Sequence, residues 1–585
     1  MGSSYKAPLD EIRFVLYDLL DAERTYAKLG VANATREVMD AVLEEAARFT
    51  ESVLSPLNEV GDQIGCAHDN STGAVTTPPG FRAAYDKFVE GGWTGLTAPE
   101  AMGGQDMPES LGAAVKEMID SANLGWGNYP LLSHGAIEAL KHHGTPWQQQ
   151  AFLLPIIAGT WTGTMCLTEP QAGSDLGLLR TRAEPAAPAA DGTETFAITG
   201  TKIFITGGEH DLTDNIVHLV LARLPDAPAG TKGISMFIVP KFRVGTDGSV
   251  GERNAVACAS IEHKMGIHGS STCVMNFDGA QGYLIGEKHR GLNAMFTMMN
   301  TARLAVGLQG LGVAERALQN AERYALERLQ GRALTGARFP DKPADPIAVH
   351  APVRNMLLGS RALVEGGRML ALHATMQVDI MERATDPAER EEAEALLGFL
   401  TPIVKACLTE WAVQVTNDCM QVFGGMGYIR ETGMEQLARD ARITTIYEGT
   451  TQIQALDLLG RKILQQQAKG MRVFLGMIQR FCEAQAANPE MHEFVLPLAE
   501  ATKQWGQMTM EVAQKAGADP GKTGEIATDY LWYAGYTVLA YWWAREAAAP
   551  TARASGGSDR YAAARFYFAK VLPRIATHAA LIRAA

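Results

Sequence analysis

One glutamate stands where a carboxylate could act as a base. Glu448 lies between an aromatic residue, Tyr447, and Gly449, and the run 449–451 (Gly-Thr-Thr) resists helix continuation and exposes backbone amides. A carboxylate held in a cleft at this point would be desolvated, which raises its pKa toward working pH and suits general-base catalysis. From this stretch alone, an ordinary glutamate at a helix boundary is the commoner explanation.

Two further stretches combine residue types that suit contact with a flat ligand. Residues 166–175 read Cys-Leu-Thr-Glu-Pro-Gln-Ala-Gly-Ser-Asp, and the backbone amides beside Ser174 could bind a phosphate. A plain turn between domains explains this loop equally well. In residues 200–206, Phe204 and Thr206 share one face of a strand, so they could stack on a ring and donate a hydrogen bond to it. A simple cross-strand pair is the more frequent explanation of that pattern.

A third stretch is rich in glycine inside a helical context. Residues 421–428 read Gln-Val-Phe-Gly-Gly-Met-Gly-Tyr, and each helical glycine costs about 1 kcal/mol relative to alanine. We therefore expect a ligand or a partner backbone to approach closely there. No strand precedes this stretch, or the similar residues 307–312, so neither is a dinucleotide-binding fingerprint. The sequence contains no P-loop, no G-x-S-x-G elbow and no metal cluster with ligand spacing.

The elements that must position these residues change type along the chain. Helical periodicity dominates to about residue 158, short β-type runs follow, and helical patterns return from about residue 290. This order predicts an α+β, mainly α fold. The expected parts are an N-terminal extension (1–36), a helical domain (37–160), an antiparallel β domain (161–285), a helical bundle (286–467) and an additional C-terminal helical domain (468–585).

Composition narrows the class of protein. The chain has 585 residues, with 46% hydrophobic and 20% charged, which is typical of a globular protein with several domains. Its net charge of -13 argues against general binding to nucleic acid or anionic membranes. The seven cysteines are scattered without a C-x-x-C pair, which favours free thiols in a reducing cytosol. We expect a cytoplasmic protein without a signal peptide.

Two local features stand apart from this average. The apolar run 530–544 is shorter than the roughly 20 residues of a membrane span, so we expect a buried helix and no span. The end of the chain is basic, with a single acid, Asp559, among six cations: Arg553, Arg560, Arg565, Lys570, Arg574 and Arg583. Such spacing more often marks a solvated helix face or a subunit contact than a nucleic-acid site.

Taken together, four ordered motifs resemble those of acyl-CoA dehydrogenases. They are Thr-Glu-Pro-x-Ala-Gly-Ser-Asp at 168–175, Gly-x-Lys-x-aromatic-Ile-Thr at 200–206, Gln-x-x-Gly-Gly-x-Gly-Tyr at 421–428, and Arg-Asp-(x)6-Tyr-Glu-Gly-Thr at 439–450. The resemblance covers about residues 40 to 465. The leader 5–9 and the long C-terminal block resemble a bacterial branch of the family, the 3-methylmercaptopropionyl-CoA dehydrogenases.

The resemblance implies a role for each matching position. Glu448 matches the base that removes the α-proton of an acyl-CoA thioester. The positions that match FAD contacts are Leu167, Thr168, Ser174, Phe204, Thr206, Arg328, Gln421, Gly424, Gly425, Thr450 and Gln452. The positions that match substrate contacts are Ser174, Arg303 and Gly449. No metal is implied.

Some positions depart from the family's pattern. Phe204 stands where a tryptophan is usual, which keeps stacking but loses the indole donor, and Gly433 replaces a frequent proline. Gly331 and Arg332 stand where Phe-Gly is frequent, and a proline-rich insertion (333–352) follows. The implied FAD contact of Arg328 across a subunit interface depends on how that insertion folds.

The resemblance implies FAD-dependent α,β-dehydrogenation of an acyl-CoA to a trans-2-enoyl-CoA, with electrons leaving through an electron-transfer flavoprotein. The branch points to 3-methylmercaptopropionyl-CoA or another short-chain acyl-CoA, and to a homodimer. Three alternatives stay open. They are a dehydrogenase for medium or long chains, an oxidase of the same fold, and a DNA-associated flavoprotein, for which the basic tail is the single feature.

Overall fold

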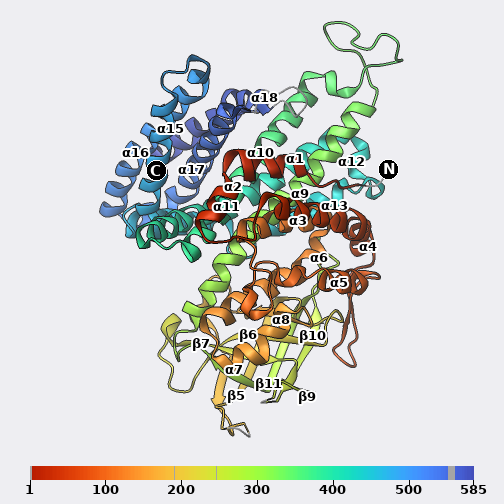
Figure 1. Cartoon of the computed structure of the whole chain (residues 1–585), viewed down its shortest axis with the longest axis vertical. Helices are drawn as coiled ribbons and strands as arrows, with labels where there is room; N and C mark the ends of the chain where they lie inside the picture. Colours follow the sequence, from red (N-terminus) through yellow and green to blue (C-terminus); the bar gives the residue numbers. More distant parts are fainter. Residues whose placement is uncertain (1–2, 190–191, 246, 551–559) are drawn as a thin grey trace. The chain divides into compact units, whose positions relative to one another are not determined.

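The computed structural model describes residues 3–189, 192–245, 247–550 and 560–585. The chain forms two compact units. Unit 1 comprises Met1–Glu51, Pro108–Ala122 and Arg303–Ala585, and unit 2 comprises Ser52–Met107 and Asn123–Ala302. Unit 1 is helical, and unit 2 combines helices with the main β-sheet (Figure 1). This confirms the predicted mainly helical α+β fold with a β middle region.

Unit 2 carries a seven-stranded sheet with the order β10-β11-β5-β4-β6-β3, in which β7 pairs with both β11 and β6. Its strands are β3 (Trp161–Cys166), β4 (Arg182–Pro185), β5 (Phe196–Thr206), β6 (Asn215–Arg223), β7 (Ile234–Pro240), β10 (Val256–Ile261) and β11 (Thr272–Ile285). A separate two-stranded ribbon joins β8 (Phe242–Val244) to β9 (Val250–Arg253).

Most of these strands pair in antiparallel fashion, as predicted, but β3 runs parallel to β6. The register joins Trp161 to Asn215 and Cys166 to Val220. The difference has a topological cause, because β4 and β5 intervene in the chain before β6 returns to lie beside β3. Parallel neighbours need such a long connection. The sequence pattern shows where strands lie but not which strands pair or in which direction.

Strand β6 is buried on both faces, which explains its continuous apolar sequence. Val217 and Leu219 belong to one hydrophobic cluster, in which Phe152 is also buried. Val220 belongs to a second cluster on the alternate side, with Phe237. Alternate residues of one strand therefore fill two cores.

The helical part of unit 2 contains a small hairpin that helical periodicity did not reveal. Strands β1 (Ala67–His68) and β2 (Val75–Thr76) pair in antiparallel register. The Asp69 carboxylate accepts hydrogen bonds from the Ser71 N–H at 2.7 Å and the Ser71 hydroxyl at 2.6 Å. Such local side-chain bonds favour a turn over a helix.

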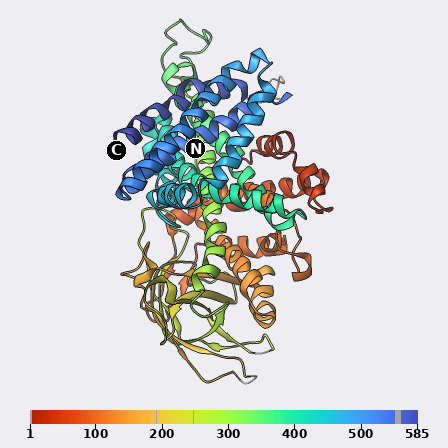
Figure 2. The same cartoon turned by 90° about the vertical axis from the view of Figure 1, so that its left-hand side faces the viewer.

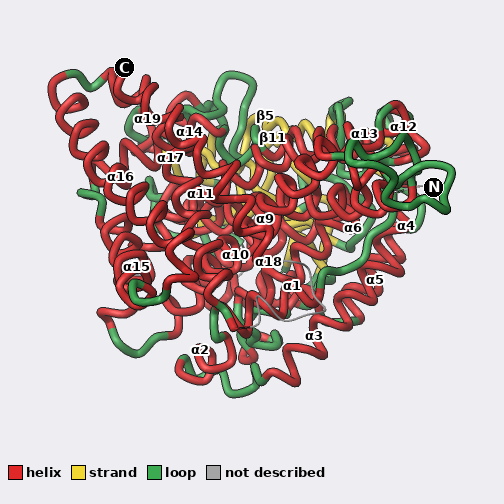
Figure 3. Tube along the Cα trace, turned by 90° about the horizontal axis from the view of Figure 1, so that it is seen from above, coloured by secondary structure: helices red, strands yellow, loops and turns green. Residues whose placement is uncertain are grey.

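Unit 1 is a bundle of long helices. The central ones are α9 (Gly291–Glu327), which begins in unit 2, α10 (Ala351–Arg383) and α11 (Pro387–Phe423), and α10 lies beside α11 (Figure 3). Gly307 and Gly310 let α9 approach α11, because a Cβ at these positions would lie 2.7 Å from Val404 Cγ1 and 2.9 Å from the Leu408 carbonyl oxygen. The glycines of 307–312 therefore serve helix packing.

Further helices of unit 1 complete the bundle, together with the first part of α6 (Glu109–His143), which continues into unit 2. These further helices are α1 (Leu9–Arg13), α2 (Ala22–Lys28), α3 (Arg36–Phe49), α12 (Gly425–Tyr428), α13 (Met434–Thr444), α14 (Thr451–Leu456), α15 (Lys469–Gln485), α16 (His492–Ala518), α17 (Gly521–Ala548), α18 (Arg560–Phe566) and α19 (Ile575–Ala584). The blue C-terminal helices α15, α16 and α17 pack side by side (Figure 2).

The apolar run 530–544 lies within α17, which confirms the predicted buried helix; Tyr530, Trp542 and Trp543 are almost fully buried. Among the described residues, one helix is long and apolar enough to cross a membrane. It is α11, and 78% of its most apolar window is buried inside the protein. Burial of this kind is typical of a core helix.

The N-terminal segment packs on α9. Side-chain amides of α9 bond its backbone: Asn320 Oδ1 accepts from the Ser4 N–H at 3.1 Å, and Gln319 Nε2 donates to the Lys6 carbonyl at 2.7 Å. Further along, the Glu11 carboxylate accepts from Arg560 of α18 at 2.8 Å. The segment thus joins the bundle to the C-terminal helices within unit 1.

The basic end of the chain is neutralised by acids of unit 1. Arg560 pairs with Glu11, Arg565 Nη2 lies 2.8 Å from Glu493 Oε1, and Arg583 Nε lies 3.6 Å from Glu511 Oε2. Arg553 and Asp559 lie outside the described residues. These pairings offset three of the six positive charges on which the alternative of a DNA-associated flavoprotein rested.

Candidate active site

Glu448 lies in a strained turn between α13 and α14. Its backbone adopts φ = 56°, and Gly449 follows at φ = 91°. A left-handed conformation is uncommon for a residue with a side chain and costs on the order of 1–3 kcal/mol unless its surroundings hold it. Gly449 also avoids a clash, since a Cβ there would lie 2.7 Å from Gln454 Nε2.

Two buried side chains hold successive carbonyl groups of this turn. Gln454 Nε2 donates to the Glu448 carbonyl at 3.1 Å, and Lys405 Nζ donates to the Gly449 carbonyl at 2.6 Å. Both side chains are fully buried. Within the described part of the chain, the Glu448 N–H has no hydrogen-bond partner, so this donor is available to a ligand.

The start of α14 and a residue of α9 fix the two ends of the turn. Thr450 caps α14, because its hydroxyl accepts from the Ile453 N–H at 3.4 Å. The Thr451 hydroxyl donates to Glu410 Oε1 at 2.6 Å. On the other side, the Tyr447 hydroxyl donates to Gln309 of α9.

Electrostatics suit Glu448 to proton transfer near neutral pH. Burial raises the pKa of its carboxyl to about 7, although the nearby charges of Arg303 and Lys405 act in the opposite direction. Arg303 is 6% exposed, and its Nη1 lies 3.5 Å from Asp457 Oδ2. Its Nε is buried with no hydrogen-bond partner among the described residues, so it remains free to bind a ligand.

The loop that follows β3 in unit 2 is anchored by a buried ion pair. Lys202 Nζ donates to Glu169 Oε1 at 2.9 Å and to the Leu167 carbonyl at 3.0 Å. Burial raises the pKa of Glu169, but the charge of Lys202 and hydrogen bonds from Thr181 and the Arg180 N–H outweigh it and lower that pKa to about 2.

The same loop is tied to β5 by its backbone, since the Thr168 carbonyl accepts from the Ile203 N–H at 2.9 Å. Leu167 and Thr168 are partly exposed, and Ser174 is exposed.

A β-bulge in β5 turns the Phe204 ring outward. The pairing with β11 slips between Ile205, opposite Cys273, and Lys202, opposite Met275. Phe204 falls in this slip with φ = 58°, and its side chain is 59% exposed. Bulges often re-aim a side chain beside a functional site. Phe204 and Thr206 flank the buried Ile205 and both keep exposed surface.

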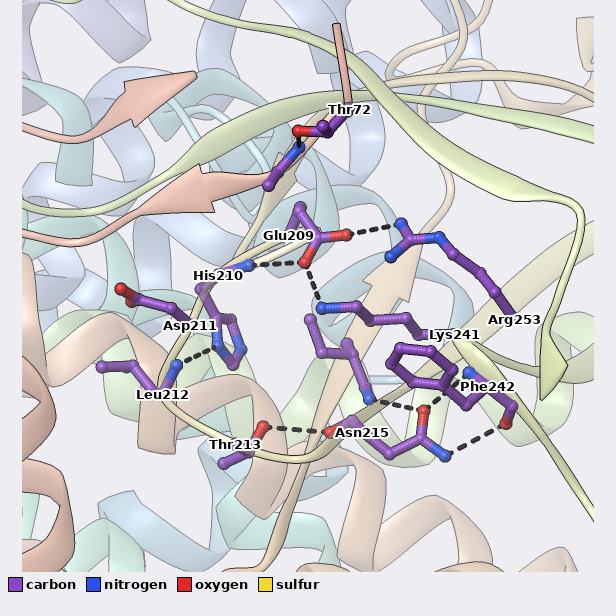
Figure 4. Close-up of polar contacts among 12 residues, drawn as sticks. Thr72, Glu209, His210, Asp211, Leu212, Thr213, Asn215, Lys241, Phe242 and Arg253 are labelled. Atoms are coloured by element: carbon purple, nitrogen blue, oxygen red, sulfur yellow. Dashed lines mark hydrogen bonds and ion pairs between the residues drawn. The ribbon is translucent and has the colours of Figure 1, made fainter. Parts of the chain in front are cut away.

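The turn after β5 is held by the charge network in Figure 4. The Glu209 carboxylate is buried and pairs with both Lys241 and Arg253, the latter at 2.9 Å. The Glu209 carbonyl also accepts from the Ser271 hydroxyl at 3.0 Å. The end of the strand that carries Phe204 and Thr206 is therefore fixed.

The remaining candidate residues gather at one end of the unit 1 bundle. The Tyr324 ring of α9 stacks on the Phe423 ring of α11, with centroids 4.1 Å apart. Arg328 follows α9 directly, while Gln421, Gly424 and Gly425 lie at the end of α11, and all four are exposed. Gly424 has φ = 59°, and a Cβ on Gly424 or Gly425 would meet nothing within 4 Å.

The insertion after Arg328 folds back on itself and returns to bond the backbone of the arginine. Leu329 forms a β-bridge with Pro346, and the Ile347 N–H donates to the Arg328 carbonyl at 2.8 Å. Inside the loop, the fully buried Asp345 accepts hydrogen bonds from the backbone N–H groups of Ala333, Arg338 and Phe339.

Thus unit 1 brings Glu448, Gly449, Thr450 and Arg303 together. It places Arg328 just beyond the C-terminal end of α9, roughly 38 Å along the helix from Arg303 at 1.5 Å per residue. Gln452 is exposed on the first turn of α14. The roles of all these residues stay predictions.

Sequence reasoning missed Lys405, Gln454 and the Glu169–Lys202 pair. A signal existed for Lys405, which stands alone as a charge in the apolar run 402–408 of α11. Buried charges must be paired or hydrogen-bonded. The sequence gives no means to find the partner, which lies 44 residues away at Gly449.

Comparison with known proteins identifies the protein family. Sequence models described as the N-terminal, middle and C-terminal domains of acyl-CoA dehydrogenase match residues 37–160, 164–280 and 289–464. A model described as acetyl-CoA dehydrogenase C-terminal like matches residues 474–585. The chain belongs to the acyl-CoA dehydrogenase family, and it is a flavin-dependent oxidoreductase that acts on the CH–CH group of acyl-CoA thioesters.

Among curated relatives, 3-methylmercaptopropionyl-CoA dehydrogenase of Ruegeria pomeroyi is 44% identical over 92% of this chain and 91% of its own length. A butyryl-CoA dehydrogenase of Syntrophomonas wolfei is 35% identical over 79% of this chain and 76% of its own. An acyl-CoA dehydrogenase of Bacillus anthracis, solved with FAD, shares the fold at TM-score 0.75 and 20% identity, covering 94% of this chain and 88% of its own.

Proposed function

We propose that this protein binds FAD and oxidises a short-chain acyl-CoA, with 3-methylmercaptopropionyl-CoA as the first candidate substrate. The supporting observation is Glu448, which is held in a strained turn with its carboxyl pKa raised to about 7. The name of the relative that is 44% identical supports the substrate.

Three structural observations support FAD binding by the residues present. The Phe204 ring is exposed on a bulge that needs a left-handed backbone, so an apolar ring is held in the open. Thr206 keeps exposed surface one residue beyond the buried Ile205. Gly424 and Gly425 leave open space where a side chain would stand, which suits close approach of a ligand or of a partner subunit.

The chain's own residues supply the acid–base part of the reaction. Glu448, as a carboxylate, takes the α-proton of the thioester. The free N–H of Glu448 donates a hydrogen bond to the thioester carbonyl and stabilises the negative charge that develops there. FAD, when bound, supplies the acceptor for the β-hydride. The positive charges of Arg303 and Lys405 keep part of the Glu448 population ionised at neutral pH.

A substrate series tests this proposal. Holoprotein is mixed with 3-methylmercaptopropionyl-CoA, butyryl-CoA and acyl-CoAs of increasing length, and loss of flavin absorbance is followed in single turnovers. We expect the highest kcat/KM for the short substrates. A clear preference for long chains contradicts the substrate assignment, and a folded protein that takes up no FAD contradicts the whole proposal.

We further propose that the protein works as a homodimer. Arg328, Gln421 and Gly424 lie at the far end of the bundle from Glu448, so they suit contact with FAD bound beside the partner's Glu448. Exposed apolar side chains near these positions, including Leu326 and Tyr428, support an interface. Light scattering should give a dimer, and Arg328→Gln should lower FAD retention while the turn at Glu448 stays intact. A monomer at working concentration contradicts this.

We propose an electron-transfer flavoprotein as the acceptor and the cytoplasm as the location. The alternative is an oxidase. Turnover that reduces an added electron-transfer flavoprotein without forming peroxide supports the dehydrogenase. Turnover that forms peroxide supports the oxidase.

A further inference from the structure

We infer that Lys405 is a positioning residue for the dehydrogenation, acting through the Glu448–Gly449 turn. Its Nζ donates to the Gly449 carbonyl at 2.6 Å from the middle of α11, and its side chain is fully buried. This inference rests on the proposed role of Glu448 as the base.

The tether holds a conformation that the turn would not keep by itself. Two successive residues, Glu448 and Gly449, have positive φ, and each of their carbonyl groups accepts a hydrogen bond from a buried side chain. Gln454 lies on α14, the helix that continues the same segment. Of these two donors, Lys405 is the one that lies on a different helix, so it fixes the two strained residues relative to α11.

The ammonium group also acts on the charge of the base. Burial lowers the pKa of Lys405 to about 8, while Glu448 and Glu410 oppose that shift and Arg303 adds to it. The charges that act on Glu448 are Arg303 of α9 and Lys405 of α11, and Glu410 of α11 acts on Lys405 in turn. Arg303 is already engaged by Asp457. Lys405 therefore couples the geometry of the turn to the ionisation of its carboxylate.

Two substitutions separate these effects. Lys405→Met removes the hydrogen bond and the charge, whereas Lys405→Gln keeps a donor without the charge. We expect Lys405→Met to slow substrate-driven flavin reduction by about tenfold to hundredfold, the loss typical of a catalytic group displaced by about 1 Å. FAD content and binding of the enoyl-CoA product should stay within about threefold of wild type, so kcat falls and KM changes little.

The pH profile gives a readout that a purely structural role would not move. With the cation removed, burial acts on Glu448 with less opposition, so the midpoint of kcat/KM should move to higher pH in both variants. Lys405→Gln should recover part of the lost rate but none of the shift in midpoint. Lys515→Met serves as the control, because Lys515 is a part-buried lysine of unit 1 whose Nζ donates to the backbone carbonyls of Ile582 and Arg583.

A wild-type rate with an unchanged midpoint in Lys405→Met overturns the inference. So does a uniform loss of FAD in both Lys405 variants, because that outcome means a general structural role. Failure of the underlying proposal is recognised separately, as rapid flavin reduction by Glu448→Gln in an otherwise normal enzyme.

Discussion

Lys202 and Glu169 join two segments of the sheet unit through a buried ion pair whose Nζ–Oε1 distance is 2.9 Å. One partner lies in β5 beside Phe204, and the other lies in the loop beside Thr168. Two candidate flavin contacts from different segments are therefore held in fixed relation by a pair that touches neither a cofactor nor the substrate in our proposal.

Breaking this pair should cost both stability and cofactor. Lys202→Met leaves the Glu169 carboxylate buried without its cation, and such changes typically cost about 3–5 kcal/mol. We expect a clear fall in melting temperature and weaker FAD retention, measured by thermal unfolding and flavin absorbance. Lys288→Met is the matched control, because Lys288 and its partner Glu194 are half exposed and such pairs contribute about 0–1 kcal/mol. Equal losses in both variants contradict the prediction.

Removing the base should stop chemistry while ligand binding survives. Glu448→Gln keeps the shape of the side chain and the backbone N–H, but an amide does not accept a proton at neutral pH. General-base contributions are typically 10²–10⁴-fold, and we expect a loss at the upper end. Stopped-flow flavin reduction measures it, with Glu431→Gln, an exposed acid of the same segment, as the control. A variant that retains more than about a tenth of the wild-type rate identifies another base.

The rate should rise with pH through neutrality. The base must be a carboxylate, and its pKa is raised to about 7, so kcat/KM falls as pH decreases below that value and Glu448 becomes protonated. A pH series from mildly acidic to mildly alkaline buffers checks this. A midpoint near 4, the ordinary value for glutamate, shows that Glu448 is not desolvated in the working enzyme.

The same group should make the fold less stable at higher pH. Its folded pKa is above its unfolded value, so the folded state holds more protons between the two values, and this contribution to stability is present at acidic pH and lost as pH rises to about 7. Glu448→Gln, which carries no charge, should gain melting temperature over wild type in apoprotein at pH 8 and show a smaller difference at pH 5. An equal difference at both pH values refutes this sign.

Short stretches of sequence predicted several features of this site. The features that they did not predict depend on contacts between residues far apart in the chain. The run after Glu448 indicated that a helix stops there, and Phe204 with Thr206 indicated a shared strand face. The positive φ of Phe204 arises from a register slip against β11, which lies about 70 residues further along the chain. The sequence of β5 alone does not contain that information.

The same holds for charges and for strand direction. Three arginines of the basic tail form ion pairs with Glu11, Glu493 and Glu511, acids that are distant in sequence. Strand β3 can pair in parallel with β6 because β4 and β5 lie between them in the chain and provide the long connection. Patterns of a few residues predict elements, whereas pairing between elements depends on long-range packing that one sequence does not display.

The contact between Glu11 and Arg560 links positions 549 residues apart, so it has a consequence for biosynthesis. Unit 2 ends at Ala302, so all its residues are made before most of unit 1. The contacts of the N-terminal segment are complete only after α18 is made, more than 250 residues beyond the end of unit 2. Because domains tend to fold as units during synthesis, we expect the sheet unit to form first, whereas the helical unit closes only once α18 has left the ribosome.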